Sequence, residues 1–325
     1  MMKTIVVAIC GLLVAYHGTT AARASDYPTQ PITLIIPFAA GGPTDVVARL
    51  LSESMSRTLG QPIVIENVVG AGGTTAAIRA MRAPADGYTI IMGHMGTHAA
   101  AVALYPKLAY KPSTDFEPIG LAVLMPVLLL GKRDIDARNL KEFIAYARRH
   151  EGQLTMAHAG VGSVSYATCM LFNSLIGLKP KMVAFQGTAP AINALVAGRI
   201  DYLCDQVVSA VPLIKASSIR AYVVGTTARN PVLPDVPTAV EAGLPEFQTS
   251  AWNALFAPKG TPKAIIDSLN TALGKALDDE KVRSHLLELG SDIPDRNKRT
   301  PQALSQLLKS EIARWTPILS KAGGE

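Results

Sequence analysis

Two glycine turns carry the residues of this chain that are best suited to hold an anion. In the first, the sequence AAGGPTD (39–45) separates a short apolar run from an amphipathic helical pattern. Gly41 and Gly42 let the backbone turn and approach a ligand closely, and Thr44 or Asp45 is expected to cap the helix. The free N–H groups at the start of such a helix attract negative charge, so this turn predicts an anion site.

The composition of this turn favours a carboxylate over a phosphate. A Walker-type phosphate loop needs a lysine, whereas no lysine or arginine lies between Pro37 and Val47. The turn also lacks the GxGxxG spacing of dinucleotide-binding folds. A carboxylate has one charge and two acceptor oxygens, which a few backbone amides and hydroxyls satisfy. For one isolated turn, the alternative is a strand-to-helix connection that binds nothing.

A second turn of the same kind lies within residues 154–172. There a strand pattern is followed by Gly160 and Gly162, and Ser163 or Ser165 can cap the helix that comes next. This segment also lacks lysine and arginine, and it has no GxSxG motif that would make Ser163 a nucleophile. Two such turns in one chain predict that a small anion is held between them.

Three histidines, His94, His98 and His158, follow predicted strands on the side of these turns. Gly93 and Gly96 are expected to interrupt any helix that would align His94 with His98, and no nearby carboxylate or thiolate completes a ligand set. We therefore expect no metal site and no cofactor. Instead, His98 or His158 is a candidate hydrogen-bond donor to the distal end of a ligand. No Ser/His/Asp or Cys/His set is evident, so no catalytic residue is assigned.

The first 24 residues have the pattern of a signal peptide. Lys3 precedes a short apolar core, and Ala22-Arg23-Ala24 fits the small-residue rule for cleavage before Ser25. The only later apolar run of note, residues 121–130, is interrupted by Pro126 and is too short to span a membrane. The sequence therefore predicts export to the periplasm.

The remaining chain carries a mild positive charge. The formal charge of +6 falls to +4 when Lys3 and Arg23 are removed, because residues 1–24 contain no acid. Basic residues occur singly or in pairs rather than in a long tract, so nucleic-acid binding is not expected. Two cysteines remain, Cys169 in a helical pattern and Cys204 in a strand pattern. The periplasm permits a disulfide, but no spacing rule joins the two, and we expect two buried thiols.

Strand and helix patterns alternate along most of the chain, which predicts an α/β fold with helices on both faces of a parallel or mixed sheet. The expected strands are residues 32–36, 62–67, 85–93, 121–131, 154–157, 181–184, 200–204, 220–225 and 252–257. The expected helices are residues 46–59, 75–81, 139–150, 163–177, 190–197, 210–216, 262–278, 279–289 and 301–321, with another from about residue 99. Residues 231–243 are proline-rich and are expected to form a loop with a short helix.

The order of these elements indicates two domains with a hinge between them. Strands 121–131 and 220–225 are expected to cross from one domain to the other, which would place a cleft at the carboxyl ends of both sheets. The expected parts are the signal peptide (1–24), domain 1 (25–124 and 226–300), domain 2 (125–225), and a C-terminal helix (301–325) packed on the lobes.

Four sequence motifs occur in a specific order along nearly all of the mature chain. They are PFAAGGPTDVVAR (37–49), IENVVGAGG (65–73), ADGYTIIMG (85–93) and NPVLPDVPTAVEAGLPEF (230–247). Together they resemble the periplasmic solute-binding proteins of the tripartite tricarboxylate transporter group, often called Bug proteins. The resemblance implies a two-lobed type II periplasmic-binding (Venus-flytrap) fold and a small carboxylate ligand. It also implies delivery of that ligand to a membrane permease of two further subunits, and we expect a monomer.

The resemblance also implies which residues contact the ligand. By motif they are Phe38, Ala40, Gly42, Thr44 and Asp45 in the first turn, Ala159, Gly160, Val161, Gly162 and Ser163 in the second, and Thr97 and Asp205 at the cleft. The chain departs from the family pattern at three places that line or adjoin the expected pocket, namely residues 185–188 (FQGT), Gln206 and Asn253. Dicarboxylates, aromatic carboxylates and amino acids therefore all remain open as ligands.

The leading interpretation is a binding protein without enzymatic activity. The alternative is an exported hydrolase or isomerase that acts on a carboxylated substrate in the same cleft, which would need a nucleophile and a base within reach. A sensor that partners a membrane receptor would use the same binding chemistry as a transport protein.

Overall fold

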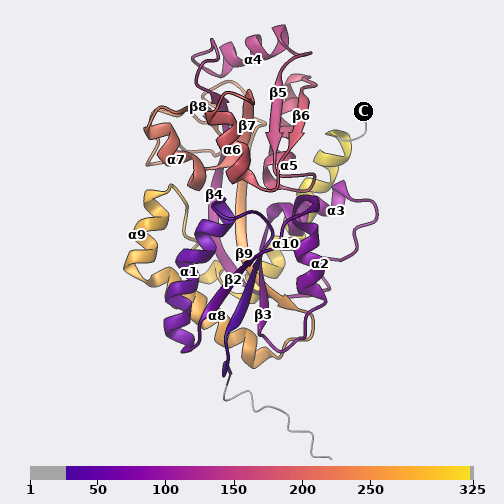
Figure 1. The fold of residues 1–325 in the computed structure, drawn as a ribbon, viewed down its shortest axis with the longest axis vertical. Helices are drawn as coiled ribbons and strands as arrows, with labels where there is room; N and C mark the ends of the chain where they lie inside the picture. The colour runs from indigo at the N-terminus through magenta and orange to yellow at the C-terminus, as the bar shows by residue number, and fades with distance from the viewer. Residues whose placement is uncertain (1–26, 323–325) are drawn as a thin grey trace, which may run out of the picture.

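The longest strand, β4 (Phe116–Lys132), runs through both lobes of the fold (Figure 1). In the computed structural model, which describes residues 27–322, two groups of strands share β4. Its first part, as far as Pro126, pairs with β9 (Ser250–Pro258). Its last part lies between β7 (Tyr202–Gln206) and β8 (Ile219–Val224). The α/β fold with two lobes predicted from the sequence is confirmed.

The first lobe has the strand order β2-β1-β3-β9-β4. Strand β1 (Ile32–Ile36) lies between β2 (Ile63–Asn67) and β3 (Thr89–His94) and runs parallel to both, whereas β9 is antiparallel to β3 and β4. In the second lobe, β5 (Thr155–His158) runs parallel to β6 (Lys181–Ala184) and to β7. Since parallel strands end at the same edge of a sheet, the turns after β1 and β3 lie together, as do those after β5 and β7.

The chain passes between the lobes twice at the same level of the fold. Val127 accepts a backbone hydrogen bond from Gly225 (2.9 Å) and donates one to Thr249 (3.3 Å), and Thr249 N donates to the Gly225 carbonyl (2.6 Å). The chain therefore returns to the first lobe where residues 225–249 lead into β9. Strand β8, which covers most of the predicted crossing 220–225, remains paired with β4 in the second lobe. No α-helix forms within 225–249, so the short helix predicted at 231–243 is wrong.

Helices cover both faces of the sheet in each lobe (Figure 1). The helices on one face are α1 (Pro43–Leu59), α6 (Thr188–Val196), α7 (Val207–Lys215), α8 (Lys263–Asp278) and α9 (Glu280–Glu288). Those on the other are α2 (Thr74–Met81), α4 (Leu140–Arg149), α5 (Val164–Ile176) and α10 (Pro301–Ala322), together with the short α3 (Ala101–Leu104). A hydrophobic core lies on each face of the sheet. Strand β1 contributes to both cores, because Leu34 and Ile36 face one side and Ile35 faces the other. Burial on both faces explains its uninterrupted apolar run.

Helix α1 begins at Pro43, three residues before the predicted start at residue 46. Pro43 occupies the first helical position, where its fixed φ and missing N–H cost nothing, and Gly42 is the N-cap. Thr44 and Asp45 therefore lie in the first turn, and the prediction that one of them caps the helix is wrong. The helix ends at Gly60, which adopts a left-handed conformation with φ of 71°.

The segment after β3 is helical from Gly96, whereas the sequence indicated a helix only from about residue 99. The helical turn η3 (Gly96–Ala100) follows β3 almost directly and continues into α3. Gly96 thus begins this turn rather than interrupting it. As a result His98 lies within the turn and points away from the face that carries His94, as the site geometry below shows.

Two helices of the second lobe begin earlier than their apolar patterns indicated. Helix α6 starts at Thr188 and α7 at Val207, whereas the expected starts were residues 190 and 210. Helix α7 follows β7 with no intervening loop, and Gln206 is both the last residue of the strand and the N-cap of the helix. Both helices therefore present their N-termini at the end of the sheet.

The C-terminal helix α10 packs against β4, η3, α3 and α5. It carries Glu311, whose Oε2 accepts hydrogen bonds from the indole N–H of Trp252 (3.1 Å) and of Trp315 (3.2 Å). Both tryptophans are almost fully buried in the core on this face. Both tryptophans therefore act as packing residues, each with its indole N–H paired.

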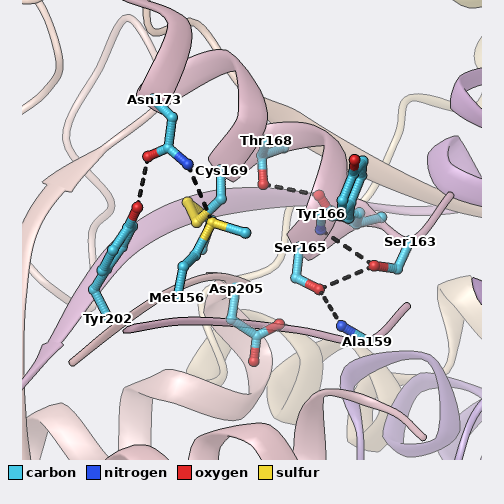
Figure 2. Close-up of a disulfide and its surroundings, with 12 residues drawn as sticks. Met156, Ala159, Ser163, Ser165, Tyr166, Thr168, Cys169, Asn173, Tyr202 and Asp205 are labelled. Carbon is cyan, nitrogen blue, oxygen red and sulfur yellow. Dashed lines mark hydrogen bonds between the residues drawn. A yellow bond between two sulfur atoms is a disulfide. The ribbon is translucent and has the colours of Figure 1, made fainter. Parts of the chain in front are cut away.

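Cys169 of α5 and Cys204 of β7 form a disulfide, with a Cα–Cα distance of 5.4 Å (Figure 2). The prediction of two free thiols is wrong. The two residues lie 35 positions apart in the chain and meet because α5 packs on β7. Their proximity therefore depends on the tertiary fold, which no local pattern reveals.

The predicted signal peptide, residues 1–24, lies outside the residues that the structure describes. Within residues 27–322, no helix combines the length and the apolar composition that a membrane span requires.

Candidate ligand-binding site

A cavity lies between the two lobes, where the turns after β1, β3, β5 and β7 meet. The space between protein atoms there amounts to about 310 Å³, part of it open to solvent. The first lobe lines it with Phe38, Ala39, Gly42, Pro43, Thr44, Asp45 and His94, and the second with Ala159, Ser163, Val164, Ser165, Thr188 and Gln206. Lysine and arginine are absent from this lining. Carboxyl ends of strands in two facing sheets are where α/β folds commonly bind ligands.

Four helices begin at this cavity. Helix α1 presents Gly42–Asp45, α5 presents Ser163–Ser165, α6 presents Thr188, and α7 presents its N-cap Gln206. The sequence predicted the ends of α1 and α5 but not those of α6 and α7. Because each helix N-terminus carries partial positive charge and unpaired N–H groups, the cavity suits an anion without any cationic side chain.

Asp45 organises the turn at the start of α1. One of its oxygens accepts hydrogen bonds from Gly41 N (2.9 Å) and Arg49 Nε (2.8 Å), and the other from Arg49 Nη2 (3.0 Å) and Asn67 Nδ2 (3.0 Å). Asn67 Nδ2 also donates to the Phe38 carbonyl (2.9 Å). Burial raises the pKa of Asp45, but the bonds from Arg49, Gly41 and Asn67 outweigh it and hold the pKa below the usual value. Asp45 thus fixes the shape of the cavity wall, and both of its carboxylate oxygens already accept hydrogen bonds from the protein.

Replacing Asp45 with asparagine is expected to lower the free energy of unfolding by about 2 kcal/mol at pH 7, since a buried charged acceptor is lost. The native pKa lies below the unfolded value, so the carboxylate stabilises the fold fully above the unfolded pKa and progressively less as pH falls through the native one. Urea unfolding of both proteins should show their difference shrinking below about pH 4. A difference that stays constant down to pH 2 would contradict this role.

Serine hydroxyls organise the turn at the start of α5 (Figure 2). Ser163 Oγ accepts from Tyr166 N (3.2 Å) and donates to the Gly160 carbonyl (2.7 Å), which confirms Ser163 as the predicted cap. Ser165 Oγ accepts from Ala159 N (2.9 Å) and lies 3.1 Å from Ser163 Oγ. Ser163 is therefore bonded to its own turn rather than to a histidine, a geometry that does not favour the hydrolase alternative.

Asp205 lies behind the cavity rather than in its wall. Its oxygens accept from Ser209 Oγ (2.5 Å) and Gln206 N (2.8 Å), and its side chain is fully buried. Burial raises the pKa of Asp205 to about 7, although these two donors and the Thr188 hydroxyl lower it. This arrangement supports the start of α7 and leaves Gln206 as the residue that reaches the cavity.

His94 is the histidine at the cavity. Its Nδ1 accepts hydrogen bonds from Gly96 N (2.8 Å) and Thr97 N (3.3 Å), and its ring stacks on Phe38 with centroids 5.0 Å apart. Burial lowers the pKa of His94 to about 3, so the ring is neutral at physiological pH. Along β3 the side chains alternate, and His94 shares the α1 face with Ile90 and Met92.

The other two histidines have structural positions. His98 packs on Phe256 with ring centroids 4.2 Å apart, in the core on the opposite face of the sheet, and its Nδ1 pairs with Thr97 Oγ1 (2.9 Å). His158 Nδ1 accepts from Gly160 N (3.0 Å). Neither lines the cavity in this conformation. Within residues 27–322 no three His, Cys, Asp or Glu side chains are grouped so that they could hold a metal ion.

The structure separates the thirteen predicted contact residues into three sets. Phe38, Gly42, Thr44, Asp45, Ala159 and Ser163 line the cavity. Gly160 and Val161 line a more open groove on the seam between the lobes, which shares Phe38 and Ala159 with the cavity. Ala40, Thr97, His98, Gly162 and Asp205 line neither space. The first set comes from both lobes, as the two-turn hypothesis requires.

The cavity lining also includes residues that sequence reasoning did not assign as contacts, among them the polar side chains of His94, Thr188 and Gln206. Thr188 and Gln206 had been noticed as departures from the family pattern, and each stands at the start of a helix, Thr188 as the first residue of α6 and Gln206 as the N-cap of α7. His94 could have been found from the alternation along β3, because every second residue faces α1.

The two lobes touch around the cavity. Ala39 N donates to the Gln186 carbonyl (3.1 Å), and the Tyr105 hydroxyl lies 2.8 Å from the Ala71 carbonyl and 2.6 Å from that of Val161. At Gly72 the backbones approach so closely that an added Cβ would overlap the Val161 carbonyl. The structure is therefore the closed form of the two lobes.

The model of the tripartite tricarboxylate transporter family receptor matches residues 47–323 of this chain. The chain belongs to this family. Proteins of the family are transport receptors, and the resemblance drawn from the four motifs is confirmed.

Solved structures agree with this assignment. MatC from Rhodopseudomonas palustris, with bound malate, is 52% identical and superposes with a TM-score of 0.89 over 90% of this chain and 99% of that chain. The periplasmic binding protein BugD is 38% identical, with a TM-score of 0.88 over 91% and 99% of the two chains. An R. palustris protein with adipate is 35% identical, with a TM-score of 0.87 over 91% and 98%.

Proposed function

We propose that this protein is an exported solute-binding receptor that closes on one small dicarboxylate and delivers it to the membrane subunits of a tripartite tricarboxylate-type transporter. The observation that carries the proposal is the meeting of four helix N-termini, from both lobes, at one enclosed cavity. The similar proteins solved with malate and adipate support a dicarboxylate over the aromatic and amino-acid alternatives. The protein acts in the periplasm as a monomer, and it has no enzymatic role.

The energetics require both lobes to engage the ligand. Micromolar affinity needs about −8 kcal/mol, whereas one helix terminus contributes roughly 0.3–2 kcal/mol. Several termini acting together with burial reach that value. In the closed form the lobes are hydrogen-bonded to each other beside the cavity, through Ala39 and Gln186 and through Tyr105 and Val161, so we expect the lobes to open before a ligand enters.

Thermal unfolding of the mature protein, residues 25–325, tests the proposal with malate, succinate, adipate, benzoate and asparagine. We expect a dicarboxylate to raise the melting temperature with concentration, by the equivalent of about 2.7 kcal/mol at one hundred times its Kd. Malate dimethyl ester is the control, because it has the same skeleton without charge and should cause no shift. Stabilisation by none of the dicarboxylates would overturn the proposal, and stabilisation by benzoate or asparagine alone would replace its ligand class.

A further inference from the structure

Two buried polar atoms of the cavity residues have no hydrogen-bond partner within the protein. They are His94 Nε2, in the first lobe, and Gln206 Oε1, in the second. The side chains of both residues are more than nine-tenths buried, with exposures of 1% and 4%. The other unpaired buried side-chain atoms of residues 27–322, among them both amide atoms of Asn253, belong to residues that do not line the cavity. Buried polar groups are normally paired, so these two atoms call for a partner in the cavity.

The surroundings of His94 fix it as a hydrogen-bond donor at Nε2. Nδ1 accepts from two backbone amides, of Gly96 and Thr97, so it carries no proton. A neutral imidazole with an accepting Nδ1 has its single proton on Nε2. The backbone of η3 therefore sets the tautomer, and Nε2–H is a donor without an acceptor in the protein.

Other parts of the His94 ring have neighbours within the protein. Gly96 lies against Cε1 and Nδ1, so that a Cβ added there would be 2.5 and 2.8 Å from these atoms. Phe38 stacks on the ring. His94 lines the cavity, and Nε2 is its ring nitrogen without a hydrogen-bond partner in the protein.

Gln206 approaches from the other lobe with a fixed backbone. Its N–H donates to Asp205 Oδ1 (2.8 Å), and its carbonyl accepts from Ser209 Oγ (3.2 Å). As the N-cap of α7, it directs its side chain past the helix end into the cavity wall. It thus offers an amide opposite the lobe that carries His94.

We propose that His94 and Gln206 together bind a hydroxyl group of the ligand, and that they select a hydroxy-dicarboxylate over its unsubstituted analogue. His94 Nε2–H donates to the hydroxyl oxygen, and the hydroxyl proton goes to Gln206 Oε1. A hydroxyl is both donor and acceptor, whereas an ionised carboxylate has no proton to give to Oε1. The carboxylates are left to the helix N-termini. This assignment rests on the proposed function.

Calorimetric titration with malate and succinate, which differ only in the hydroxyl, tests the assignment. The wild-type protein should bind malate roughly tenfold more tightly than succinate, because succinate leaves two buried groups unpaired. His94→Phe and Gln206→Leu should each weaken malate binding roughly tenfold while changing succinate binding less than threefold, so that the preference disappears. In the double variant the losses should be less than additive, because both residues serve one hydroxyl.

Matched variants separate this role from a general effect on folding. His94→Gln keeps a donor near the position of Nε2 and should restore most of the malate preference, whereas His94→Asn places its amide near Nδ1 and should not. His98→Phe makes the same chemical change on the opposite face of the sheet and should leave the ratio of the two affinities unaltered.

Two results would overturn the hydroxyl assignment. The first is an equal loss of malate and succinate affinity in His94→Phe, which would mean that His94 contacts a carboxylate. The second is an unchanged ratio in both single variants. If the wild-type protein bound no dicarboxylate at all, the proposed function itself would fail, a result distinct from either of these.

Discussion

Replacing Gly72 with alanine is expected to prevent full closure of the lobes and to weaken dicarboxylate binding roughly 100-fold. An added Cβ would overlap the carbonyl of Val161, which is backbone of the other lobe and cannot rotate away. If the overlap raises the free energy of the closed form by about 3 kcal/mol, the binding-competent population falls by the corresponding factor. Calorimetry gives the affinity, and small-angle scattering with and without ligand reports the closure.

Gly60→Ala is the matched control. Gly60 and Gly72 both adopt positive φ, of 71° and 62°, so alanine is strained at either position. At Gly60, however, no atom lies within 4 Å of an added Cβ. Gly60→Ala should therefore lower stability by about 1 kcal/mol and leave ligand affinity unchanged. Normal affinity in Gly72→Ala, or an equal loss in Gly60→Ala, would contradict the closure argument.

Removing the disulfide is expected to have the largest effect on stability. The double variant Cys169→Ala and Cys204→Ala opens a loop whose ends are 35 residues apart, which corresponds to about 4 kcal/mol of unfolding free energy in the chain-entropy account. This loss should lower the melting temperature by roughly 10 °C. Denaturant titration and calorimetry measure the two quantities.

Both cysteines are replaced together because a single replacement would leave one reactive thiol. The melting temperature of the double variant is compared with that of the wild-type protein under oxidising conditions, where the disulfide is intact. Reducing agent should lower the melting temperature of the wild-type protein but not that of the double variant. Titration of two free thiols in the unfolded, non-reduced wild-type protein would contradict the presence of the bridge.

The glycine turns could be predicted because their signals are local. A strand that ends, a pair of glycines and an amphipathic helix lie within one short segment, as in AAGGPTD (39–45). Gly42 and Ser163 accordingly line the cavity, each at the start of its helix. Capping by Thr44 or Asp45 was predicted wrongly because Pro43 favours the first helical position more strongly than either residue favours the cap.

The rest of the site depends on interactions between distant segments. The proton of His94 is placed by amides of a helical turn that begins before the helix expected from about residue 99. The ends of α6 and α7 were missed because Thr188 and Gln206 precede the apolar positions that mark a helix. The disulfide was missed because α5 and β7 meet only in the folded lobe. Local patterns therefore predicted the two glycine turns. His94 and Gln206, which are proposed to bind the ligand hydroxyl, could be identified only from the tertiary structure.

The position of β9 has a consequence for the rate at which this chain folds. It lies between β3 and β4 in the first lobe, with Asn253 opposite His94, so the sheet begun at residue 32 is complete only after residue 258 has been synthesised. Contacts between such distant residues raise the contact order and slow folding. Slower folding leaves the newly made chain unfolded for longer, which suits the export proposed above.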